Sequence, residues 1–331
     1  MNIKPKDNYL QLLRTGMPEY IPSIVCDPYF ENVNDEMIAP MSAPDGPVKT
    51  VFGVEYVGSK EINNGALPRP GFILLDDIRK WRDVIKNPDL SGRDWEGYYK
   101  KLSENYDREN KLVMCHGGDY FLTLVSFMGF ENTLLAMFEE PDEVYELLDY
   151  ISGHYLEVMR QQLKFLKPEL YAIMDDDSAY RAPFFSVDMY RRLIKPFHKK
   201  HVDMALENGI CVERHDCGRS ESFIDEWMDI GIHAWGPAQV TNDLKAIKKK
   251  YGNSLVLNGC WDNQGVLGSP AVDDDMLREA LYDYVDTFAP GGGFAFLAAI
   301  MGSPDDPEVA RKTGIIRDFY YSYARGYYAR H

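Results

Sequence analysis

Residues 170–217 read LYAIMDDDSAYRAPFFSVDMYRRLIKPFHKKHVDMALENGICVERHDC, and this stretch decides the fold. Short apolar runs at 170–177 and 210–217 predict two strands, and the pattern at 186–208 predicts a helix between them. Two strands joined by a helix lie parallel in one sheet, with a right-handed crossover. The stretch therefore predicts an α/β fold.

The same alternation continues on both sides of this unit. Before it we expect a strand at 111–118 and helices at 121–138 and 141–166. After it we expect a helix at 220–230, a strand at 232–237, a helix from Thr241 or Asn242 to 251–252, a strand at 254–260, a helix at 272–287, a strand at 292–299 and a last helix at about 307–325. Seven or eight such units, without a GxGxxG after any strand, favour a single (β/α)8 TIM barrel over an open doubly wound sheet.

The first hundred residues are less regular. A helix at 6–15 and a strand at 20–27 precede an irregular stretch at 31–75, which contains a possible hairpin at 49–59. Helical patterns follow at 76–85 and 95–109. We therefore predict one domain over residues 1–331, a barrel with an N-terminal extension and a hairpin insertion.

Composition narrows the classes of partner. The chain has 331 residues, 36 Lys and Arg against 52 Asp and Glu, and a net charge of −16. Such a charge is repelled by phosphate backbones and anionic membrane surfaces, so we expect neither nucleic acid nor membrane as a partner. Five scattered cysteines do not form a disulfide framework, and no apolar run of 18 residues occurs. These features predict a cytoplasmic protein with reduced thiols.

Residues that carry chemistry gather where predicted strands end. His116, Asp175 to Asp177, His215 with Cys217, and Cys260 all fall at such positions. In a parallel barrel the active site lies at the carboxyl ends of the strands. We therefore expect these side chains to surround one site.

The His-x-Cys pair and the later cysteine resemble a set of metal ligands. Residues two apart on a strand point to the same side, so His215 and Cys217 can reach one ion, with Cys260 on another strand end. Three nitrogen and sulfur ligands with an open fourth position are typical of catalytic zinc, and thiolates favour zinc over magnesium or calcium. The alternatives are inert buried cysteines, or a nucleophilic Cys–His pair, which leaves the second cysteine unexplained.

Several motifs resemble those of the uroporphyrinogen decarboxylase superfamily. They are ERHDCG at 213–218, GIHAWGP at 231–237, DLKAIKKKYG at 243–252 and VLNGCWD at 256–262, with further matches at 118–121, 128–132, 140–141 and 147–148. The resemblance covers most of the chain from about residue 110, and it implies a single (β/α)8 barrel.

The superfamily contains two chemistries. Its decarboxylases bind porphyrinogens through an arginine-rich N-terminal segment and use no metal, whereas residues 12–16 and 20–22 of this chain lack that basic cluster. Its cobalamin-dependent methyltransferases carry zinc on a His-x-Cys … Cys pattern, which His215, Cys217 and Cys260 match in type and order. The spacing of the two cysteines is more similar to that of the aromatic O-demethylases than to that of the coenzyme M methylases. Because a carboxylate is sometimes the third ligand there, Glu213 is an alternative to His215, and Asp176 and Asp188 are further candidates.

The resemblance implies a zinc-dependent methyltransferase that moves a methyl group from an O-methylated, methoxyaromatic substrate to the cob(I)alamin of a separate corrinoid protein. Zinc on the ether oxygen would stabilise the charge of the leaving group. The alternatives are a methylcobalamin:thiol methyltransferase of the coenzyme M type, a metal-free decarboxylase-like enzyme and a barrel-fold binding protein.

We also predict which other residues serve this chemistry. His116 is expected to hydrogen-bond the substrate or to protonate the leaving oxygen, and Asp176 is expected to face the barrel mouth, both as catalytic residues. An aromatic substrate pocket is expected from Tyr180, Trp235, Trp261 and Phe296.

Overall fold

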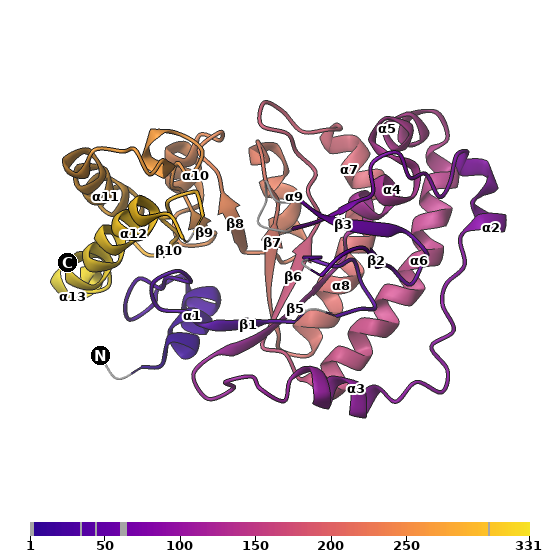
Figure 1. Cartoon of the computed structure of the whole chain (residues 1–331), viewed down its shortest axis with the longest axis horizontal. Coiled ribbons are helices and arrows are strands. Elements are labelled where there is room, and N and C mark those ends of the chain that lie inside the picture. The colour runs from indigo at the N-terminus through magenta and orange to yellow at the C-terminus, as the bar shows by residue number, and fades with distance from the viewer. Residues whose placement is uncertain (1–2, 34, 44, 60–64, 304) are drawn as a thin grey trace.

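Seven parallel strands form a curled sheet at the centre of the molecule (Figure 1). The computed structural model describes residues 3–33, 35–43, 45–59, 65–303 and 305–331. The strands, in the order in which they pair, are β1 (Phe30–Asn32), β5 (Leu112–Gly117), β6 (Leu170–Met174), β7 (Cys211–His215), β8 (Ala234–Ala238), β9 (Val256–Gly259) and β10 (Phe294–Phe296). A parallel bridge from Ser23 to Phe296 adds the segment before β1 to the edge of β10. The sheet thus curls back toward its first strand, which confirms the predicted barrel.

Helices follow the strands and cover the outside of the sheet (Figure 1). They are α4 (Tyr120–Met128), α5 (Phe130–Glu139), α6 (Pro141–Gln161), α7 (Val187–Leu193), α8 (Lys195–Glu207), α9 (Ile224–Asp229), α10 (Leu244–Tyr251), α11 (Asp274–Phe288), α12 (Pro307–Phe319) and α13 (Tyr327–Arg330). Single turns of π-helix extend α6 over Gln162–Leu166 and α12 over Tyr320–Ala324, and 3-10 turns occur at Glu221–Phe223 and Val266–Gly268.

Two helices that the sequence predicts as continuous are each broken in two. The helix expected at 121–138 breaks at Gly129, whose φ of 77° lies outside the helical region. The helix expected at 186–208 breaks at Ile194, and α8 starts anew with Pro196 in its first turn. Proline has no N–H to donate to the preceding turn, so it favours a new helix start there.

The N-terminal region adds short helices and a small second sheet. Its helices are α1 (Pro5–Thr15), the 3-10 turn η2 (Ile78–Lys80), α2 (Trp81–Val84) and α3 (Trp95–Leu102). The strand expected at 20–27 is reduced to the bridge at Ser23, and β1 lies in a stretch that was expected to be irregular. The hairpin expected at 49–59 is present as part of a three-stranded antiparallel sheet of β2 (Val48–Lys49), β3 (Glu55–Ser59) and β4 (Gly65–Pro68).

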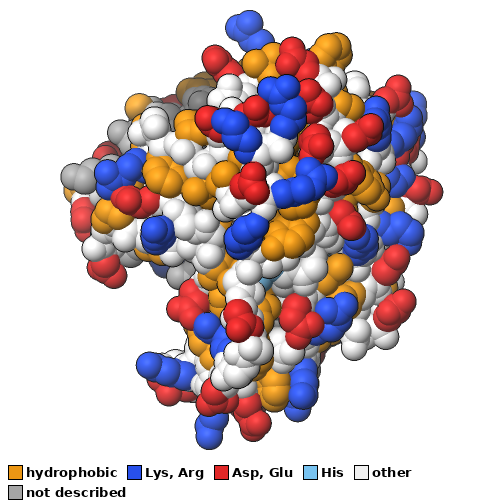
Figure 2. All heavy atoms as spheres, turned by 90° about the vertical axis from the view of Figure 1, so that its right-hand side faces the viewer, with side chains coloured by type: hydrophobic (Ala, Val, Ile, Leu, Met, Phe, Trp, Pro, Cys, Tyr) orange, Lys and Arg blue, Asp and Glu red, His pale blue; other side chains and the backbone are white. Residues whose placement is uncertain are grey.

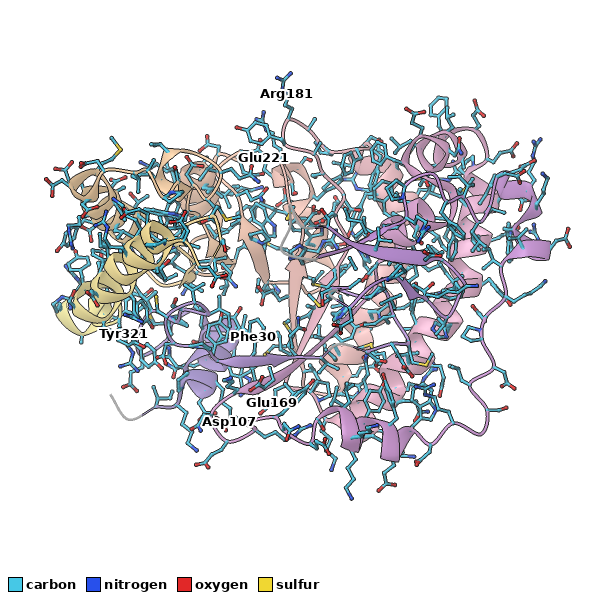
Figure 3. All side chains as sticks on the ribbon, viewed as in Figure 1. Phe30, Asp107, Glu169, Arg181, Glu221 and Tyr321 are labelled. Atoms are coloured by element: carbon cyan, nitrogen blue, oxygen red, sulfur yellow. The ribbon has the colours of Figure 1, made fainter. Side chains whose placement is uncertain are left out.

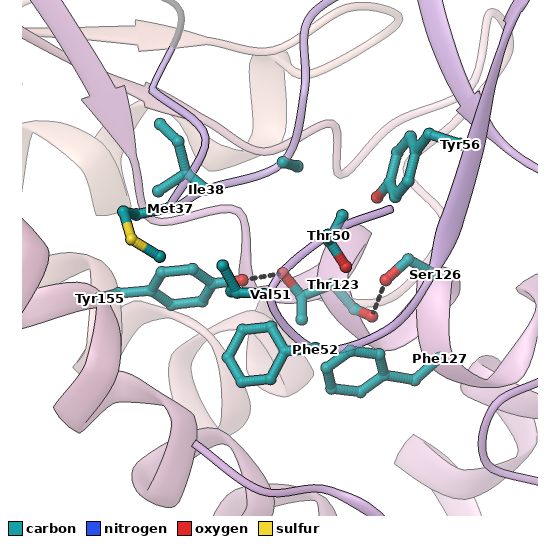
Figure 4. Close-up of a pocket in the computed structure, with 11 residues that line it drawn as sticks. Met37, Ile38, Thr50, Val51, Phe52, Tyr56, Thr123, Ser126, Phe127 and Tyr155 are labelled. Carbon is teal, nitrogen blue, oxygen red and sulfur yellow. Dashed lines mark hydrogen bonds between the residues drawn. The ribbon is translucent and has the colours of Figure 1, made fainter. Parts of the chain in front are cut away.

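This small sheet packs on α4 and α6 (Figure 4). Phe52 contacts the Phe127 and Tyr155 rings edge-on, at centroid distances of 5.5 and 6.0 Å. Tyr155 in turn shares a hydrogen bond of 2.8 Å with the Thr123 hydroxyl. The space left between these side chains is about 10 Å³, which is enough for one water molecule and no substrate.

The interior of the barrel is mostly apolar at its base, where α1 closes it. Tyr9, Leu10 and Leu12 of α1 pack against inward-facing side chains of the strands. These strand residues are Leu112, Met114, Leu170, Ala172, Ala234, Val256 and Ala295. Burying one leucine side chain stabilises a fold by about 1.5–3 kcal/mol, so the helix is held firmly in this position. A substrate must therefore enter from the end at which the strands finish.

The outer surface carries charges of both signs. Figure 2 shows Lys and Arg interspersed with Asp and Glu over the face at the right of Figure 1, where Arg82 pairs with Glu143 at 2.5 Å. Within the described part of the chain, no single helix is long and apolar enough to cross a membrane, although α4 and α5 together, bent by 112°, meet the length and composition criteria.

Candidate metal centre

Three possible metal ligands meet where β6 and β7 end. Met174 pairs with His215 in the sheet, so the two strands finish level with each other. Asp176 then lies beside Cys217, whose N–H donates to Asp176 Oδ1 at 2.8 Å. One ligand atom from each of Asp176, His215 and Cys217 lies within 4.8 Å of the other two.

The spacing of these atoms fits a zinc ion. His215 Nε2 lies 3.6 Å from Asp176 Oδ1 and 3.7 Å from Cys217 Sγ. Tetrahedral zinc with bonds of about 2.0–2.3 Å holds neighbouring ligand atoms roughly 3.3–3.8 Å apart. One imidazole, one thiolate and one carboxylate form a donor set that zinc accepts, and three protein ligands leave a fourth position open.

The electrostatics of the group keep the Cys217 thiol and the His215 ring neutral until a cation binds. Burial, followed by the charges of Asp176 and Asp216, raises the pKa of the Cys217 thiol to about 12. Burial also lowers the pKa of His215 against the opposing effect of Asp176, so its ring is the neutral form that binds metals. A bound zinc ion would displace the thiol proton, because the thiolate is the ligand.

A buried ion-pair cluster lies behind the ligands. Arg214 Nη2 donates to Asp177 Oδ2 at 2.5 Å and to Asp216 Oδ2 at 3.1 Å, and all three side chains are fully buried. Burial disfavours the Arg214 cation, but these two carboxylates outweigh that effect and raise its pKa. Asp216 also accepts from the Asp177 N–H at 3.1 Å. The cluster ties the end of β6 to the end of β7, and so fixes Asp176 against Cys217.

Cys260 lies outside this compact group. It follows β9 in a backbone conformation with a φ of 65°, and its N–H donates to the Ala238 carbonyl at 2.8 Å. The side chain is buried, and that burial raises the pKa of the thiol, whereas the nearby Lys248 lowers it. Its role as a zinc ligand stays a prediction.

The carboxylate alternatives also lie apart from the group. Both Glu213 oxygens accept hydrogen bonds, from the Tyr9 hydroxyl at 2.7 Å and from Asn258 Nδ2 at 3.2 Å. Asp188 is exposed and pairs with Arg191 one helical turn away. Of the acidic candidates, the structure brings Asp176 to His215 and Cys217.

His116 is the last residue but one of β5, the strand next to β6. It is 2% exposed, and neither of its ring nitrogens has a hydrogen-bond partner in the described part of the chain. Burial, with a further contribution from the nearby His215, lowers the pKa of His116 to about 4. The ring is therefore neutral at pH 7 and carries one N–H and one free acceptor nitrogen.

The four predicted aromatic contacts point elsewhere. Tyr180 is 65% exposed in the loop after β6. Trp235 packs on Trp227 and donates its Nε1 hydrogen to the Asp216 carbonyl at 2.9 Å. Trp261 and Phe296 both contact the Tyr284 ring, outside the barrel interior. Their roles in substrate binding stay predictions.

A cavity of about 330 Å³ opens beside His215 in the barrel mouth. Its lining residues come from nearly every strand, from the segment before β1 and from the loops that follow β1 and β10. They are Ile24, Phe30, Asn32, Met41, Met114, Ala172, Met174, Glu213, His215, Gly236, Pro237, Asn258 and Leu297. Figure 3 marks the two ends of the barrel, with Arg181 and Glu221 at the edge where strands finish and Asp107 and Glu169 at the edge where they begin. Alternation along the strands identifies part of this lining. Met114, Met174 and Glu213 each lie two residues before an expected site residue, and so lie on the same strand face as that residue.

Comparisons with known proteins agree with this architecture. The family model described as uroporphyrinogen decarboxylase (URO-D) matches residues 101–298. No curated protein matches the chain. Among solved structures, a methyltransferase from Methanosarcina mazei is similar, with a TM-score of 0.64 and 13% sequence identity over 97% of this chain and 100% of the other. At that identity the likeness shows the fold alone.

Proposed function

Because the chain belongs to the uroporphyrinogen decarboxylase (URO-D) family, we propose that it is a zinc-dependent methyltransferase built on that fold. The substrate would be an O-methylated, methoxyaromatic compound, and the acceptor would be the cob(I)alamin of a separate corrinoid protein. The observation that carries the proposal is the group of Asp176, His215 and Cys217 at the edge of the mouth cavity. A solved methyltransferase with the same fold supports it.

The identity of the third ligand is part of the proposal. His215 and Cys217 are common to both candidate sets. Asp176 completes the set that the distances support, and Cys260 completes the set that the sequence motif supports. A zinc ion bound there supplies a Lewis acid that stabilises negative charge on the ether oxygen.

The side chains of the chain then orient the substrate and handle a proton. Apolar cavity walls would exclude water and orient the methyl ether toward the corrinoid acceptor. The methyl–oxygen bond would break with its electron pair left on oxygen, and the reduced corrinoid would supply the electron pair of the new bond to the methyl group. The leaving oxygen takes up a proton from solvent, and His116, whose neutral ring has no partner among the residues described, is the group proposed to hydrogen-bond that oxygen.

The cavity favours this chemistry over decarboxylation of a porphyrinogen. A four-ring polycarboxylate needs cationic partners, but no Lys or Arg lines the described cavity. Its volume of about 330 Å³ lies at the lower end of the range for small-molecule sites. A methylcobalamin:thiol methyltransferase remains the second candidate, since the same ligands would bind and activate a thiol.

The direct test is formation of methylcobalt. Reduced cob(I)alamin is mixed with the zinc-loaded protein and a panel of methoxyaromatics, methanol, methylamines and methyl thiols, and the absorbance change of the corrinoid is followed. We expect turnover with methoxyaromatics, its loss in His215→Ala and its retention in His233→Ala. His233 is an exposed histidine just before β8, at the opposite end of the barrel. The proposal fails if no panel member yields methylcobalt, or if both variants behave alike.

A further inference from the structure

The floor of the mouth cavity is a buried polar group in an otherwise apolar lumen. Glu213 is 9% exposed and lies two residues before His215 on β7. Its Oε2 accepts from the Tyr9 hydroxyl at 2.7 Å, and its Oε1 accepts from Asn258 Nδ2 at 3.2 Å. Tyr9 comes from α1, so this polar group forms where that helix closes the barrel. A buried carboxylate without a cation is costly, and the two hydrogen bonds that it accepts offset part of that cost.

The group retains capacity to accept further hydrogen bonds. A carboxylate has about four lone-pair positions, and two of those on Glu213 are used. Because a carboxylate only accepts, Asn258 must turn its NH2 toward Glu213, which leaves its Oδ1 facing elsewhere. That Oδ1 is buried and has no hydrogen-bond partner among the residues described. Such a buried unpaired acceptor calls for a donor from a ligand or a water molecule.

Space for this group is provided by the neighbouring strand. A Cβ atom on Gly236 of β8 would lie 2.9 Å from Glu213 Oε1 and 3.1 Å from Asn258 Cβ. Any side chain at Gly236 would therefore push into the carboxylate. The glycine allows both polar side chains to reach the cavity.

The rest of the lining makes the floor selective. Apart from Asn32 and His215, the remaining lining residues are apolar or glycine, and none of them is Lys or Arg. At the floor, a negatively charged ligand group would meet the Glu213 carboxylate with no Lys or Arg in the cavity lining to offset the repulsion. A group that donates hydrogen bonds would find two acceptors, Glu213 and Asn258.

We propose that this floor binds a hydrogen-bond donor, a hydroxyl or a protonated amine, at the end of the substrate away from its methyl ether, and rejects a carboxylate there. This inference rests on the proposed function, which puts the methyl ether at His215. Two residues of a strand rise by roughly 6.6 Å, so the distance between His215 and Glu213 suits a substrate about one aromatic ring long. The substrate class is then methoxyphenols or methoxyaryl amines, and methoxybenzoates are excluded.

Ligand binding without corrinoid tests this directly. Titration calorimetry of the zinc-loaded protein with 4-methoxyphenol, 4-methoxybenzylamine and 4-methoxybenzoate compares hydroxyl, ammonium and carboxylate. A hydrogen bond to a charged group corresponds to about 10- to 100-fold in affinity, so the better donor ligand should bind at least tenfold more tightly than the benzoate. The proposal is overturned if the benzoate binds as tightly as both donors.

Variants assign the discrimination to the floor. Glu213→Gln keeps the shape and removes the charge, and should reduce the preference for donor over benzoate about tenfold. Asn258→Ala keeps the Glu213 carboxylate and should weaken binding of the donor ligand several-fold. This variant replaces Glu213→Gln as the test if Glu213→Gln does not fold. His233→Ala, an exposed position at the opposite end of the barrel, should leave the preference unaltered. An unchanged preference in both folded floor variants overturns the proposal.

The outcome is separable from that of the proposed function. Donor preference without any methylcobalt formation would support the binding floor and reject the methyl transfer. Methylcobalt formation from methoxybenzoates and methoxyphenols alike would support methyl transfer and reject the binding floor.

Discussion

Replacing Cys217 by serine removes a thiolate from the proposed zinc site and changes little else. Its backbone N–H still donates to Asp176 Oδ1, because that bond uses no side-chain atom of Cys217. Zinc binding to four protein ligands is worth about 10–16 kcal/mol, or roughly 2.5–4 kcal/mol for each ligand. Loss of one ligand thus corresponds to about a 100- to 1,000-fold loss of zinc affinity.

The assay is competition for zinc with a chromophoric chelator, run at constant pH because thiol ligands release protons on binding. Cys211→Ser is the matched control, since Cys211 begins the same strand β7 at the other end of the barrel. Asp176→Asn and Cys260→Ser then identify the third ligand. If the described distances hold in the zinc-bound protein, Asp176→Asn lowers the affinity at least tenfold and Cys260→Ser leaves it within a few-fold.

Two results would refute this reasoning. A folded Cys217→Ser protein that binds zinc as tightly as the unaltered chain would remove Cys217 from the site. A loss in Cys260→Ser together with no change in Asp176→Asn would replace the carboxylate by the second thiolate, and would require Cys260 to turn from its present contacts toward His215.

Three further changes test the surrounding structure. Arg214→Met leaves the buried carboxylates of Asp177 and Asp216 without their cation, and should destabilise the protein by about 3–5 kcal/mol in urea unfolding. A loss of stability under about 1 kcal/mol would contradict the role assigned to the ion-pair cluster. Burial, then the charges of His198 and Lys200, lowers the pKa of His201 to about 3, so the unfolded chain binds the extra proton first as the pH falls below about 6.5. Stability should therefore drop by roughly 2 kcal/mol for this residue between pH 7 and pH 5, and His201→Gln should lessen that drop by a similar amount. Gly129→Ala, at a φ of 77°, should lower the free energy of unfolding by about 1–2 kcal/mol. Gly153→Ala lies inside α6, where a new Cβ meets no atom within 4 Å, and should raise the free energy of unfolding by about 0.5–1 kcal/mol. Equal effects of the two changes would contradict the conformational argument.

The barrel was predictable because its signal is local. Most strands from β5 to β10 are short runs rich in apolar residues and bounded by helical patterns, and parallel pairing follows from that order. The helix breaks were not predicted, because the residues around Gly129 and Ile194 keep a helical pattern on both sides of the break. A glycine in a helical pattern is usually tolerated, and only tertiary packing decides that it takes a positive φ.

The site was predictable in part for a related reason. Strand ends identified His215 and Cys217, but the partner of these two depends on register between strands. The pairing of Met174 with His215 sets Asp176 beside Cys217, and no pattern within either strand encodes that alignment. The hydrogen bond from Tyr9 to Glu213 joins residues 204 positions apart, so the sequence pattern does not predict that α1 closes the barrel.

The two faces of β7 have different roles in the proposed site. Glu213 and His215 face the lumen, where one forms the cavity floor and the other a proposed metal ligand. Arg214, between them, points the opposite way with Asp216 and joins this strand to the end of β6. Because alternation has a period of two, a shift of one residue in β7 would exchange these faces and bury the binding groups behind the barrel wall. Register of this single strand therefore sets the positions of Glu213, of His215 and of the ion-pair clamp on Asp176 together.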